Sequence, residues 1–301
     1  MLRVRRDDME LWKTEIAQTA QAVEERLGLL LREKDPAFAP LYEGMRYSAL
    51  AGGKRIRPVL VLAFSDLFGG DRETALSFAA AIEMVHTYSL IHDDLPCMDN
   101  DDYRRGRLTN HKVYGEAEAV LAGDALLTMA FETIAAAKAD AECRIRAVYT
   151  LASQAGACGM VGGQMMDMQA ERERPSLDTL RKLHDCKTGA LICAAAELGC
   201  LAAGIRDEKV IADCRSYARG IGRAFQIVDD VLDAYGDREL LGKDIGSDVS
   251  EGKTTYLTYM TRDEAMQEAA ELTAQAKQAL LPYAGSQLLC SFADGLLNRK
   301  K

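Results

Sequence analysis

The sequence predicts an all-α protein, and three observations lead to that conclusion. Long segments repeat apolar residues at helical spacing, whereas segments that alternate apolar and polar residues, as strands do, are nearly absent. The chain has only six prolines, and its turn signals are sparse. Its 301 residues are enough to bury a large core. We therefore expect a single domain, residues 1–301, made of ten or more helices.

The clearest helical segments lie between the few turn signals and cover residues 9–32, 72–92, 116–139 and 177–203. Asp71 and Ser176 precede two of them, and a short polar side chain at that position accepts a hydrogen bond from the first turn. We therefore expect both residues to be N-caps. Several of these helices are apolar almost all round, which is typical of helices inside a large bundle.

Charge and cysteine content limit the function. The net charge of −9 argues against nucleic acid as a partner. Three of the eight cysteines recur every seven residues, at Cys186, Cys193 and Cys200, and we expect them to be buried thiols on one packed face. The first thirteen residues are charged and contain no apolar stretch typical of a secretory signal. No uncharged apolar run reaches the ~18 residues of a membrane span. We therefore expect a cytoplasmic protein without stable membrane insertion.

An aspartate cluster follows the helix expected at 72–92. At i, i+4, i+7 and i+11, one stripe of that helix carries Ile82, His86, Ser89 and Asp93. Pro96 should end the helix near Leu95, because proline cannot continue it. The break would give Asp99 an approach direction different from that of Asp93.

A second cluster, Asp229-Asp230-Val231-Leu232-Asp233, lies 136 residues further along the chain. The same spacing places one polar stripe on Gly222, Gln226, Asp229 and Asp233, and an apolar stripe on Ile221, Phe225, Val228 and Leu232. We therefore expect a helix that is buried on one side and lines a wet cavity on the other.

Carboxylates that gather at helix ends need a cation. Two of them ~5 Å apart repel by about 3 kcal/mol at an effective dielectric of ~20, and a helix C-terminus adds to the repulsion. Oxygen ligands favour a hard ion, and Mg²⁺ is the usual choice where phosphates share the coordination sphere. The two clusters therefore predict a magnesium site.

Basic residues near the clusters indicate what the metal ions would bind. Residues 52–58 form a glycine turn followed by three cations at the start of a helix, which is an arrangement that binds anions. Further basic sites are Arg104-Arg105-Gly106-Arg107, Lys187-Thr188-Gly189, Lys243-Asp244 and Lys253-Thr254. Each alone could be an ordinary solvated surface. Together they favour a metal-bridged diphosphate and a second, directly bound anion.

With these residues the chain resembles a known family, the trans-isoprenyl diphosphate synthases, and most closely the bacterial farnesyl diphosphate synthases within it. The matching segments are GGKRIRP (52–58), EMVHTYSLIHDDLPCMDNDDYRRGR (83–107), GEAEAVLAGDALL (115–127), KTGALI (187–192), FQIVDDVLD (225–233) and GKDIGSDVSEGKTTY (242–256). The resemblance implies the isoprenoid synthase fold, a large helical bundle around a central apolar cavity, and a homodimer.

The family joins an allylic diphosphate to isopentenyl diphosphate, head to tail, and the resemblance assigns roles to individual residues. Three Mg²⁺ ions per active site would clamp the allylic diphosphate through Asp93, Asp99 and Asp229, with support from Asp94 and Asp233. The same diphosphate would be contacted by Arg104, Lys187 and Lys243. The isopentenyl diphosphate would be held by Lys54, Arg57, His86 and Arg105, although His86 could also be an ordinary core histidine. Thr188 and Gln226 would flank the reacting carbons, and Lys253 would help to close the site. The catalytic set is therefore Lys187, Thr188, Gln226 and Lys243.

Product length is expected to depend on Tyr88 and Ser89. Tyr88 lies five residues before Asp93, about 7–8 Å deeper along the helix. An aromatic residue there, with two extra residues between the aspartates of the first motif, resembles the bacterial type that stops at C15. An ordinary core tyrosine is the alternative. We therefore expect a farnesyl diphosphate synthase, with geranylgeranyl and geranyl diphosphate synthases as the alternatives.

Other functions fit the sequence less well. A class I terpene cyclase ionises a similar diphosphate but has no use for a second anion site. A di-iron bundle would need a second Glu-x-x-His besides the one formed by Glu83 and His86. A calcium loop beginning at Asp99 would need glycine in place of Arg104. A non-catalytic subunit would be expected to lack an aspartate motif or the GGKR turn.

Overall fold

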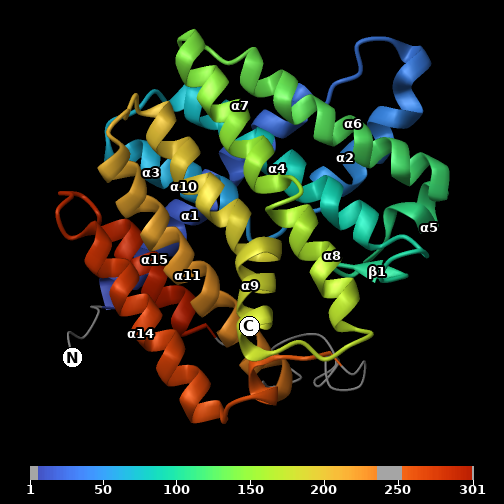
Figure 1. The fold of residues 1–301 in the computed structure, drawn as a ribbon. Coiled ribbons are helices and arrows are strands. Elements are labelled where there is room, and N and C mark those ends of the chain that lie inside the picture. The colour runs from blue at the N-terminus through green and yellow to red at the C-terminus, as the bar shows by residue number, and fades with distance from the viewer. Residues whose placement is uncertain (1–5, 236–252, 300–301) are drawn as a thin grey trace. The chain divides into compact units, whose positions relative to one another are not determined.

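A computed structural model describes residues 6–235 and 253–299 (Figure 1). These residues form helices, apart from one hairpin of two-residue strands, so the all-α prediction is confirmed. The chain divides into two compact units. Of the described residues, the amino-terminal unit holds Thr14–Tyr149 and Leu198–Gly204, and the carboxy-terminal unit holds 6–13, 150–197, 205–235 and 253–299. A single domain around a central apolar cavity stays a prediction.

The amino-terminal unit contains most of the first half of the chain. Its elements are α1 (Arg6–Leu30, which begins in the other unit), η1 (Pro36–Phe38), α2 (Ala39–Ala49), α3 (Ile56–Leu67), α4 (Arg72–Asp93), β1 (Tyr103–Arg104), β2 (Arg107–Leu108), α5 (Asn110–Tyr114), α6 (Glu116–Ala135) and the first part of α7 (Ala141–Ala155). The two strands pair antiparallel, with Tyr103 opposite Leu108.

Helix α4 is the core helix of this unit, and α3 and α6 pack against it (Figure 1). Its central residues 79–82 are fully buried, which explains why its sequence is apolar almost all round. Asp71 accepts the backbone N–H of Thr74 over 2.8 Å, so the predicted N-cap is confirmed. The helix ends at Asp93, three residues before Pro96, as the sequence predicted.

By length and composition α4 could also cross a membrane. Its most apolar stretch has a mean hydropathy of 1.2, but 83% of that stretch is buried inside the protein. This is what the core helix of a folded bundle shows, and among the described residues α4 is the one helix that meets both criteria.

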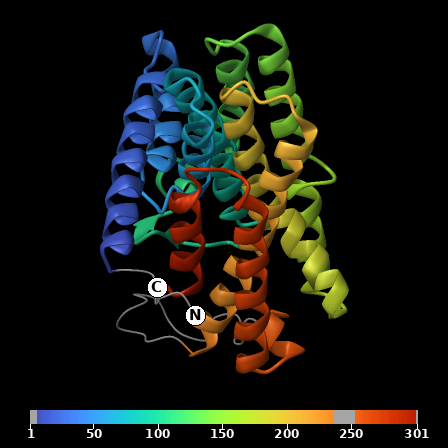
Figure 2. The same cartoon turned by 90° about the vertical axis from the view of Figure 1, so that its left-hand side faces the viewer.

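The carboxy-terminal unit is built around α11. Its elements are the end of α7, α8 (Met160–Ala170), α9 (Leu177–His184), the π-helical turn η2 (Asp185–Gly189), the start of α10 (Ala190–Ala202), α11 (Glu208–Tyr235), η3 (Tyr256–Thr258), α14 (Arg262–Leu280) and α15 (Gln287–Leu297). Helices α14 and α15, orange-red and red, run side by side (Figure 2). Ser176 accepts the backbone N–H of Thr179 over 3.2 Å, so this N-cap is also confirmed.

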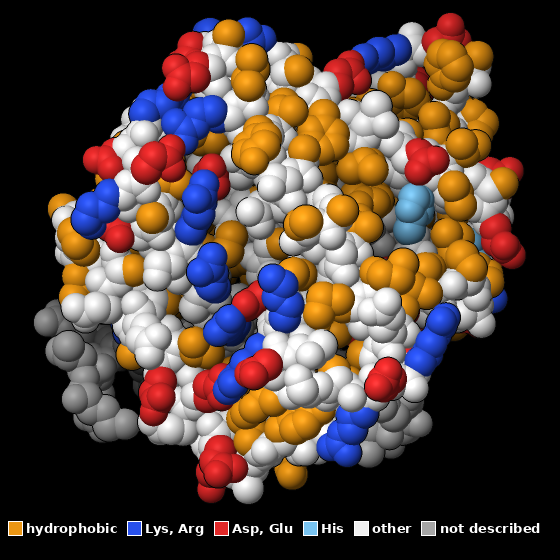
Figure 3. All heavy atoms as spheres, in the orientation of Figure 1, with side chains coloured by type: hydrophobic (Ala, Val, Ile, Leu, Met, Phe, Trp, Pro, Cys, Tyr) orange, Lys and Arg blue, Asp and Glu red, His pale blue; other side chains and the backbone are white. Residues whose placement is uncertain are grey.

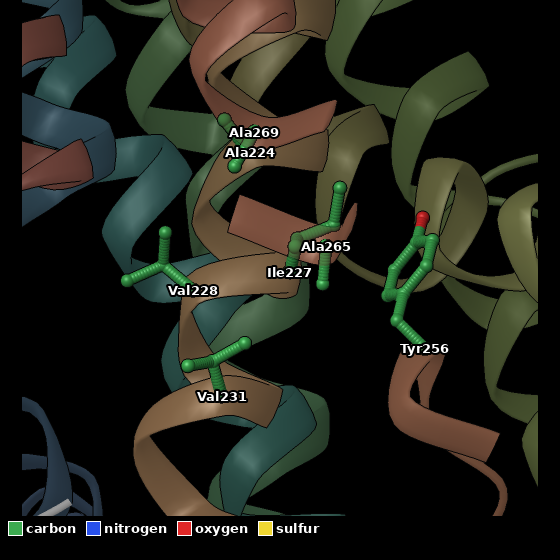
Figure 4. Close-up of a cluster of buried hydrophobic side chains, with 7 residues drawn as sticks. All are labelled: Ala224, Ile227, Val228, Val231, Tyr256, Ala265 and Ala269. Atoms are coloured by element: carbon green, nitrogen blue, oxygen red, sulfur yellow. The ribbon is translucent and has the colours of Figure 1, made fainter. Parts of the chain in front are cut away.

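Helices α11 and α14 bury a small apolar core between them. It consists of Ala224, Ile227, Val228 and Val231 of α11, Ala265 and Ala269 of α14, and Tyr256 (Figure 4). The alanines let the two backbones approach, and each fully buried Ile or Val contributes about 1.5–3 kcal/mol. The apolar stripe expected on α11 is buried at Ile221 and Val228 and only partly buried at Phe225 and Leu232.

The segment expected as one helix over 177–203 is interrupted by the π-helical turn η2. Single π-turns inside α-helices are frequent at functional sites. Two glycines of neighbouring helices leave room for the backbone of η2. A Cβ on Gly163 of α8 would lie 2.2 Å from the backbone nitrogen of Lys187, and one on Gly222 of α11 would lie 3.4 Å from the Cα of Gly189. Cys186 lies within this turn, so the seven-residue cysteine spacing does not continue in α-helical register. All eight cysteines are thiols, and burial raises the pKa of Cys193 to about 11.

Many surface cations of the carboxy-terminal unit are paired with acids. Arg181 lies 2.9 Å from Glu268, Arg215 lies 2.6 Å from Glu197, and Arg223 binds both oxygens of Asp185. Figure 3 shows Lys and Arg side chains beside Asp and Glu side chains over α9 and α11. An anion would have to compete with these acids for the cations.

Candidate active site

The first aspartate cluster forms a closed loop at the end of α4. The backbone N–H of Asp99 donates to the carbonyl of Asp93 over 2.8 Å, and those of Met98 and Asn100 donate to the carbonyl of Leu95 over 2.9 and 3.1 Å. The loop therefore returns to its own start, and both aspartates sit on one short segment. Asp93 is partly buried and Asp99 is exposed, so solvent or a ligand can reach both residues.

Asp94 differs from its neighbours because it is buried and bound to Arg104. The Nε and terminal nitrogens of Arg104 both lie 2.6 Å from Oδ1 of Asp94, which is 3% exposed. Burial raises the pKa of the Asp94 carboxyl, and the hydrogen bond and charge of Arg104 oppose that rise. In this structure Arg104, expected on the allylic diphosphate, thus fixes strand β1 to the end of α4.

The glycine turn before α3 separates the three cations that follow it. Gly52 and Gly53 have φ values of 75° and 128°, which only glycine adopts without strain. Arg55 is buried and bound to Glu83 at 2.6 Å and to Glu24 at 3.1 Å, so it is structural. Lys54 is exposed.

Several arginines, Arg57 and Arg105 among them, surround His86. The pKa of Arg57 is lowered to about 10, chiefly by burial; the charge of Glu83 opposes this effect and the charge of Arg105 adds to it. The Nε of Arg57 is buried and has no hydrogen-bond partner within the described part of the chain. Burial and then the surrounding arginines hold the pKa of His86 well below 6.5, so its imidazole is neutral at neutral pH. An anion bound here would accept hydrogen bonds from Arg57, Arg105 and His86.

Arg105 is held in place by the same turn. Its guanidinium donates to the carbonyl of Gly52, and a Cβ on Gly53 would lie 2.6 Å from its Cζ. Gly53 is therefore required for the guanidinium to approach the turn. The structure brings Arg105 together with Arg57 and His86, three of the four residues expected to hold isopentenyl diphosphate.

Tyr88 and Ser89 lie one turn before the aspartates. Tyr88 is 7% exposed, and burial, followed by the charge of Asp93, raises the pKa of its phenol. Its ring meets the ring of His92 edge-on, with the centroids 5.7 Å apart. The hydroxyl of Ser89 donates to the carbonyl of His86 over 2.9 Å, within α4.

In the carboxy-terminal unit, α11 and the π-turn place the expected catalytic side chains together. The Thr188 hydroxyl lies 3.4 Å from Oε1 of Gln226, and Nε2 of Gln226 donates to Oδ1 of Asp230 over 3.0 Å. Lys187 donates to Asp167 of α8 over 2.5 Å. Asp167 is thus the partner of a predicted catalytic lysine.

The second aspartate cluster lines an open cleft. The cleft has a volume of about 560 Å³, and its lining includes Asp230, Asp233 and Lys253. The α8–α9 loop adds Arg172 and Arg174 to the lining. Of the polar stripe expected beside a wet cavity, Asp233 lines this cleft, which has basic and acidic groups on its wall. Gln226 and Asp229 do not line it, so the expectation for the whole stripe stays a prediction. Lys243 lies outside the described residues.

Two aspartates of this cluster have partners that the sequence did not predict. Asp230 is 4% exposed and accepts the backbone N–H of Tyr256 over 2.9 Å. Asp229 accepts a hydrogen bond from Arg299 over 2.8 Å, and the guanidinium of Arg299 lies 4.0 Å from the ring of Phe225. Asp230 lies one residue beyond Asp229 and so points away from the polar stripe, which is a sequence signal for a different partner. The sequence around Arg299 gives no comparable signal for its contact with Asp229.

The donor set fits Mg²⁺, because the candidate ligands Asp93, Asp99 and Asp229 offer only carboxylate oxygens. Among residues 6–235 and 253–299, no three acidic, histidine or cysteine side chains converge tightly enough to hold a metal ion. Protein sites for Mg²⁺ commonly use one or two carboxylates together with substrate phosphates and water. The carboxylates of either unit could therefore bind Mg²⁺ together with phosphate oxygens and water.

Comparisons with known proteins agree with one another. Residues 39–281 match the family model for polyprenyl synthetase. The farnesyl diphosphate synthase of Escherichia coli (strain K12) is 45% identical over 87% of this chain and 90% of its own length. A geranylgeranyl diphosphate synthase of Cyanophora paradoxa is 44% identical over 95% of this chain and 96% of its own. The crystal structure of an FPP/GFPP synthase from Zymomonas mobilis superposes with a TM-score of 0.86 at 39% identity, covering 96% of this chain and 99% of that one.

Proposed function

This chain belongs to the polyprenyl synthetase family, whose members elongate trans-prenyl diphosphates, and we propose that its own product is farnesyl diphosphate. The substrates would be isopentenyl diphosphate and dimethylallyl or geranyl diphosphate. Farnesyl and geranylgeranyl diphosphate synthases are about equally similar to this chain, so the proposal on product length rests on its own residues.

The observation that carries the two-substrate reaction is the group of cations around His86. Arg57 has a buried nitrogen without a hydrogen-bond partner among the described residues, Arg105 is fixed beside it, and the His86 ring is neutral and can donate a hydrogen bond. A diphosphate bound there would be held by charge-assisted hydrogen bonds. We assign this site to isopentenyl diphosphate, together with Lys54.

In the proposed mechanism, the C–O bond of the allylic diphosphate breaks and its electron pair leaves with the diphosphate. Mg²⁺ bound to Asp93, Asp99 and Asp229 would supply charge neutralisation for that leaving group. Lys187, held by Asp167, adds positive charge. Arg104 would do so only by sharing its hydrogen bonds with Asp94. Lys243 and Lys253 would complete the set.

The carbon skeleton is extended in the second half of the reaction. The double bond of isopentenyl diphosphate attacks the allylic cation, and loss of one proton to the departing pyrophosphate restores a double bond. Thr188 and Gln226 present oxygens that would stabilise the cation without trapping it. No protein nucleophile takes part. Because water would react with the allylic cation, the proposed mechanism requires an apolar pocket that excludes it.

Tyr88 supports the assignment to C15. It is buried at a depth of about 7–8 Å from Asp93 along α4, where its ring would stop a growing chain. Tyr88→Ala is expected to give products of C20 and longer. A folded, active Tyr88→Ala variant that still makes only C15 would remove this support and leave geranylgeranyl diphosphate as the competing product.

The function is tested by incubating the protein with Mg²⁺, isopentenyl diphosphate and geranyl diphosphate. Pyrophosphate release only when both substrates are present supports the synthase, and chromatography of the products gives their length. Release from the allylic substrate alone would indicate a terpene cyclase, and no release would indicate a non-catalytic subunit. The homodimer and the cytoplasmic location are also proposals. Light scattering on the purified protein tests the first, and fractionation of the source cells tests the second.

A further inference from the structure

The ring of His92 fills a place on α6 that only glycine can offer. A Cβ on Gly123 would lie 2.2 Å from Nε2, 2.6 Å from Cδ2 and 3.0 Å from Cε1 of His92. A side chain at position 123 would therefore require the imidazole to shift. Glycine within a helix costs about 0.5–1 kcal/mol relative to alanine. The close approach of the imidazole therefore explains why residue 123 is glycine, which the helix itself does not favour.

A hydrogen bond fixes the ring in this position. Nε2 of His92 lies 3.1 Å from the carbonyl oxygen of Val120, one turn before Gly123 on α6. A carbonyl only accepts, so Nε2 carries the proton. Asp124, the next residue of α6, has Oδ1 4.0 Å from the same nitrogen. Helix α6 therefore positions the imidazole in two ways. The Val120 carbonyl accepts its hydrogen bond, and Gly123 has no side chain in its place.

The other side of the imidazole supports Tyr88. Tyr88 and His92 are four residues apart on α4, so their side chains lie one above the other. Their rings meet edge-on at 5.7 Å with an interplanar angle of 81°. Helices α4 and α6 lie side by side along this contact (Figure 1). A change at Gly123 would therefore reach Tyr88 through His92.

We propose that His92 and Gly123 determine product length, because together they hold the Tyr88 ring across the path of the growing prenyl chain. This inference rests on the proposed function, in which Tyr88 is the floor of the hydrocarbon pocket. His92 acts as a positioning residue and need not touch the substrate. Without the imidazole, the phenol ring can turn into the vacated space, and the pocket deepens.

The test is the product distribution of four variants with Mg²⁺, isopentenyl diphosphate and geranyl diphosphate. His92→Ala is expected to shift the main product from C15 to C20. His92→Phe keeps a ring against Tyr88 and is expected to keep C15. Gly123→Ala should displace the imidazole and lengthen the product like His92→Ala. In the double variant His92→Ala/Gly123→Ala the two side chains do not clash, so it provides the same test should Gly123→Ala fail to fold, and its product should match that of His92→Ala.

Gly28→Ala is the matched control. Gly28 lies within α1, and a Cβ there would meet nothing within 4 Å, so its product should stay at C15. C15 as the main product of His92→Ala would overturn the inference, provided that Tyr88→Ala lengthens the chain in the same assay. If Tyr88→Ala also leaves C15 unchanged, the proposed floor itself is wrong, and the inference fails with it. Lengthening by His92→Phe equal to that by His92→Ala would also contradict it, because a ring would then not suffice.

Discussion

Asp230 accepts the backbone N–H of Tyr256 over 2.9 Å and so ties the segment that begins at Lys253 to the helix that carries the second aspartate cluster. Its other oxygen accepts from Gln226 over 3.0 Å. Both carboxylate oxygens are thus engaged with donors. Asp230 therefore holds two parts of the candidate site together, while its neighbours Asp229 and Asp233 are the candidates for metal binding.

Asp230→Asn should loosen this connection. An amide offers one acceptor oxygen where the carboxylate offers two, so one donor, Tyr256 or Gln226, loses its partner. A hydrogen bond to a charged group contributes about 1.5–3 kcal/mol, and we expect faster amide hydrogen exchange at 254–258 and a roughly tenfold loss of kcat/KM. Asp178→Asn, at a side chain that is 94% exposed, is the control for the same chemical change. Unchanged exchange at Tyr256 would contradict the proposed role.

Arg104 and Asp94 should behave as one unit. Arg104→Met leaves a buried carboxylate without its partner and should lower the free energy of unfolding by about 3–5 kcal/mol. The double variant Arg104→Met/Asp94→Asn should be more stable than the sum of the single effects by about 1–3 kcal/mol. Urea unfolding measures both. Strictly additive losses would show that the pair is not coupled.

Arg299 should compete with a metal ion for Asp229. Its nitrogen lies 2.8 Å from Oδ1 of Asp229, whose side chain is 48% exposed. Such a pair is worth about 0.2–1 kcal/mol, so Arg299→Gln should tighten metal binding by about 1.5–5-fold. Electron paramagnetic resonance of Mn²⁺ with inorganic pyrophosphate measures this without turnover. Lys277→Gln, which breaks the pair with Asp294 at 2.8 Å, makes the same change in net charge as a control. Weaker metal binding in Arg299→Gln, without the same change in Lys277→Gln, would contradict competition for Asp229.

His184 should make the protein less stable in mild acid. Burial lowers the pKa of its imidazole to about 4, and its Nδ1 has no partner within residues 6–235 and 253–299. Between that value and the ordinary pKa of 6.5, the unfolded chain binds a proton that the folded chain does not, so stability falls as pH falls. The loss between pH 7 and pH 5 should be about 2 kcal/mol from this residue. His184→Gln should show a smaller loss when unfolding is followed at both pH values. An identical loss in the variant would mean that other groups cause it.

Local patterns predicted the elements because they depend on neighbours in the chain. The apolar spacing correctly predicted the first residues of α4 and α6. Asp71 and Ser176 cap their helices, and α4 ends shortly before Pro96, as expected. In each case the cause lies within one or two turns of the effect. The two motifs and the family resemblance also came from local runs of residues.

The π-turn could not be predicted in the same way. It places Lys187 and Thr188 where a regular helix would not, and it depends on glycines of α8 and α11 that admit its backbone. Likewise, three cations follow the glycine turn, but only packing against Glu83 and Glu24 makes Arg55 structural. Position in the sequence does not distinguish it from Arg57.

The sequence by itself therefore determined the helices, their caps and the chemistry of the residues offered for catalysis, since these follow from hydrogen bonding and periodicity along one segment. Only the tertiary structure decided which of those residues remain available. Asp94, Asp229 and Asp230 have the same side chain, yet one is bound by Arg104, one by Arg299 and one by the Tyr256 backbone. Those partners lie 10, 70 and 26 residues away along the chain. The partner of a carboxylate is set by which helices pack together, and packing is a property of the whole core.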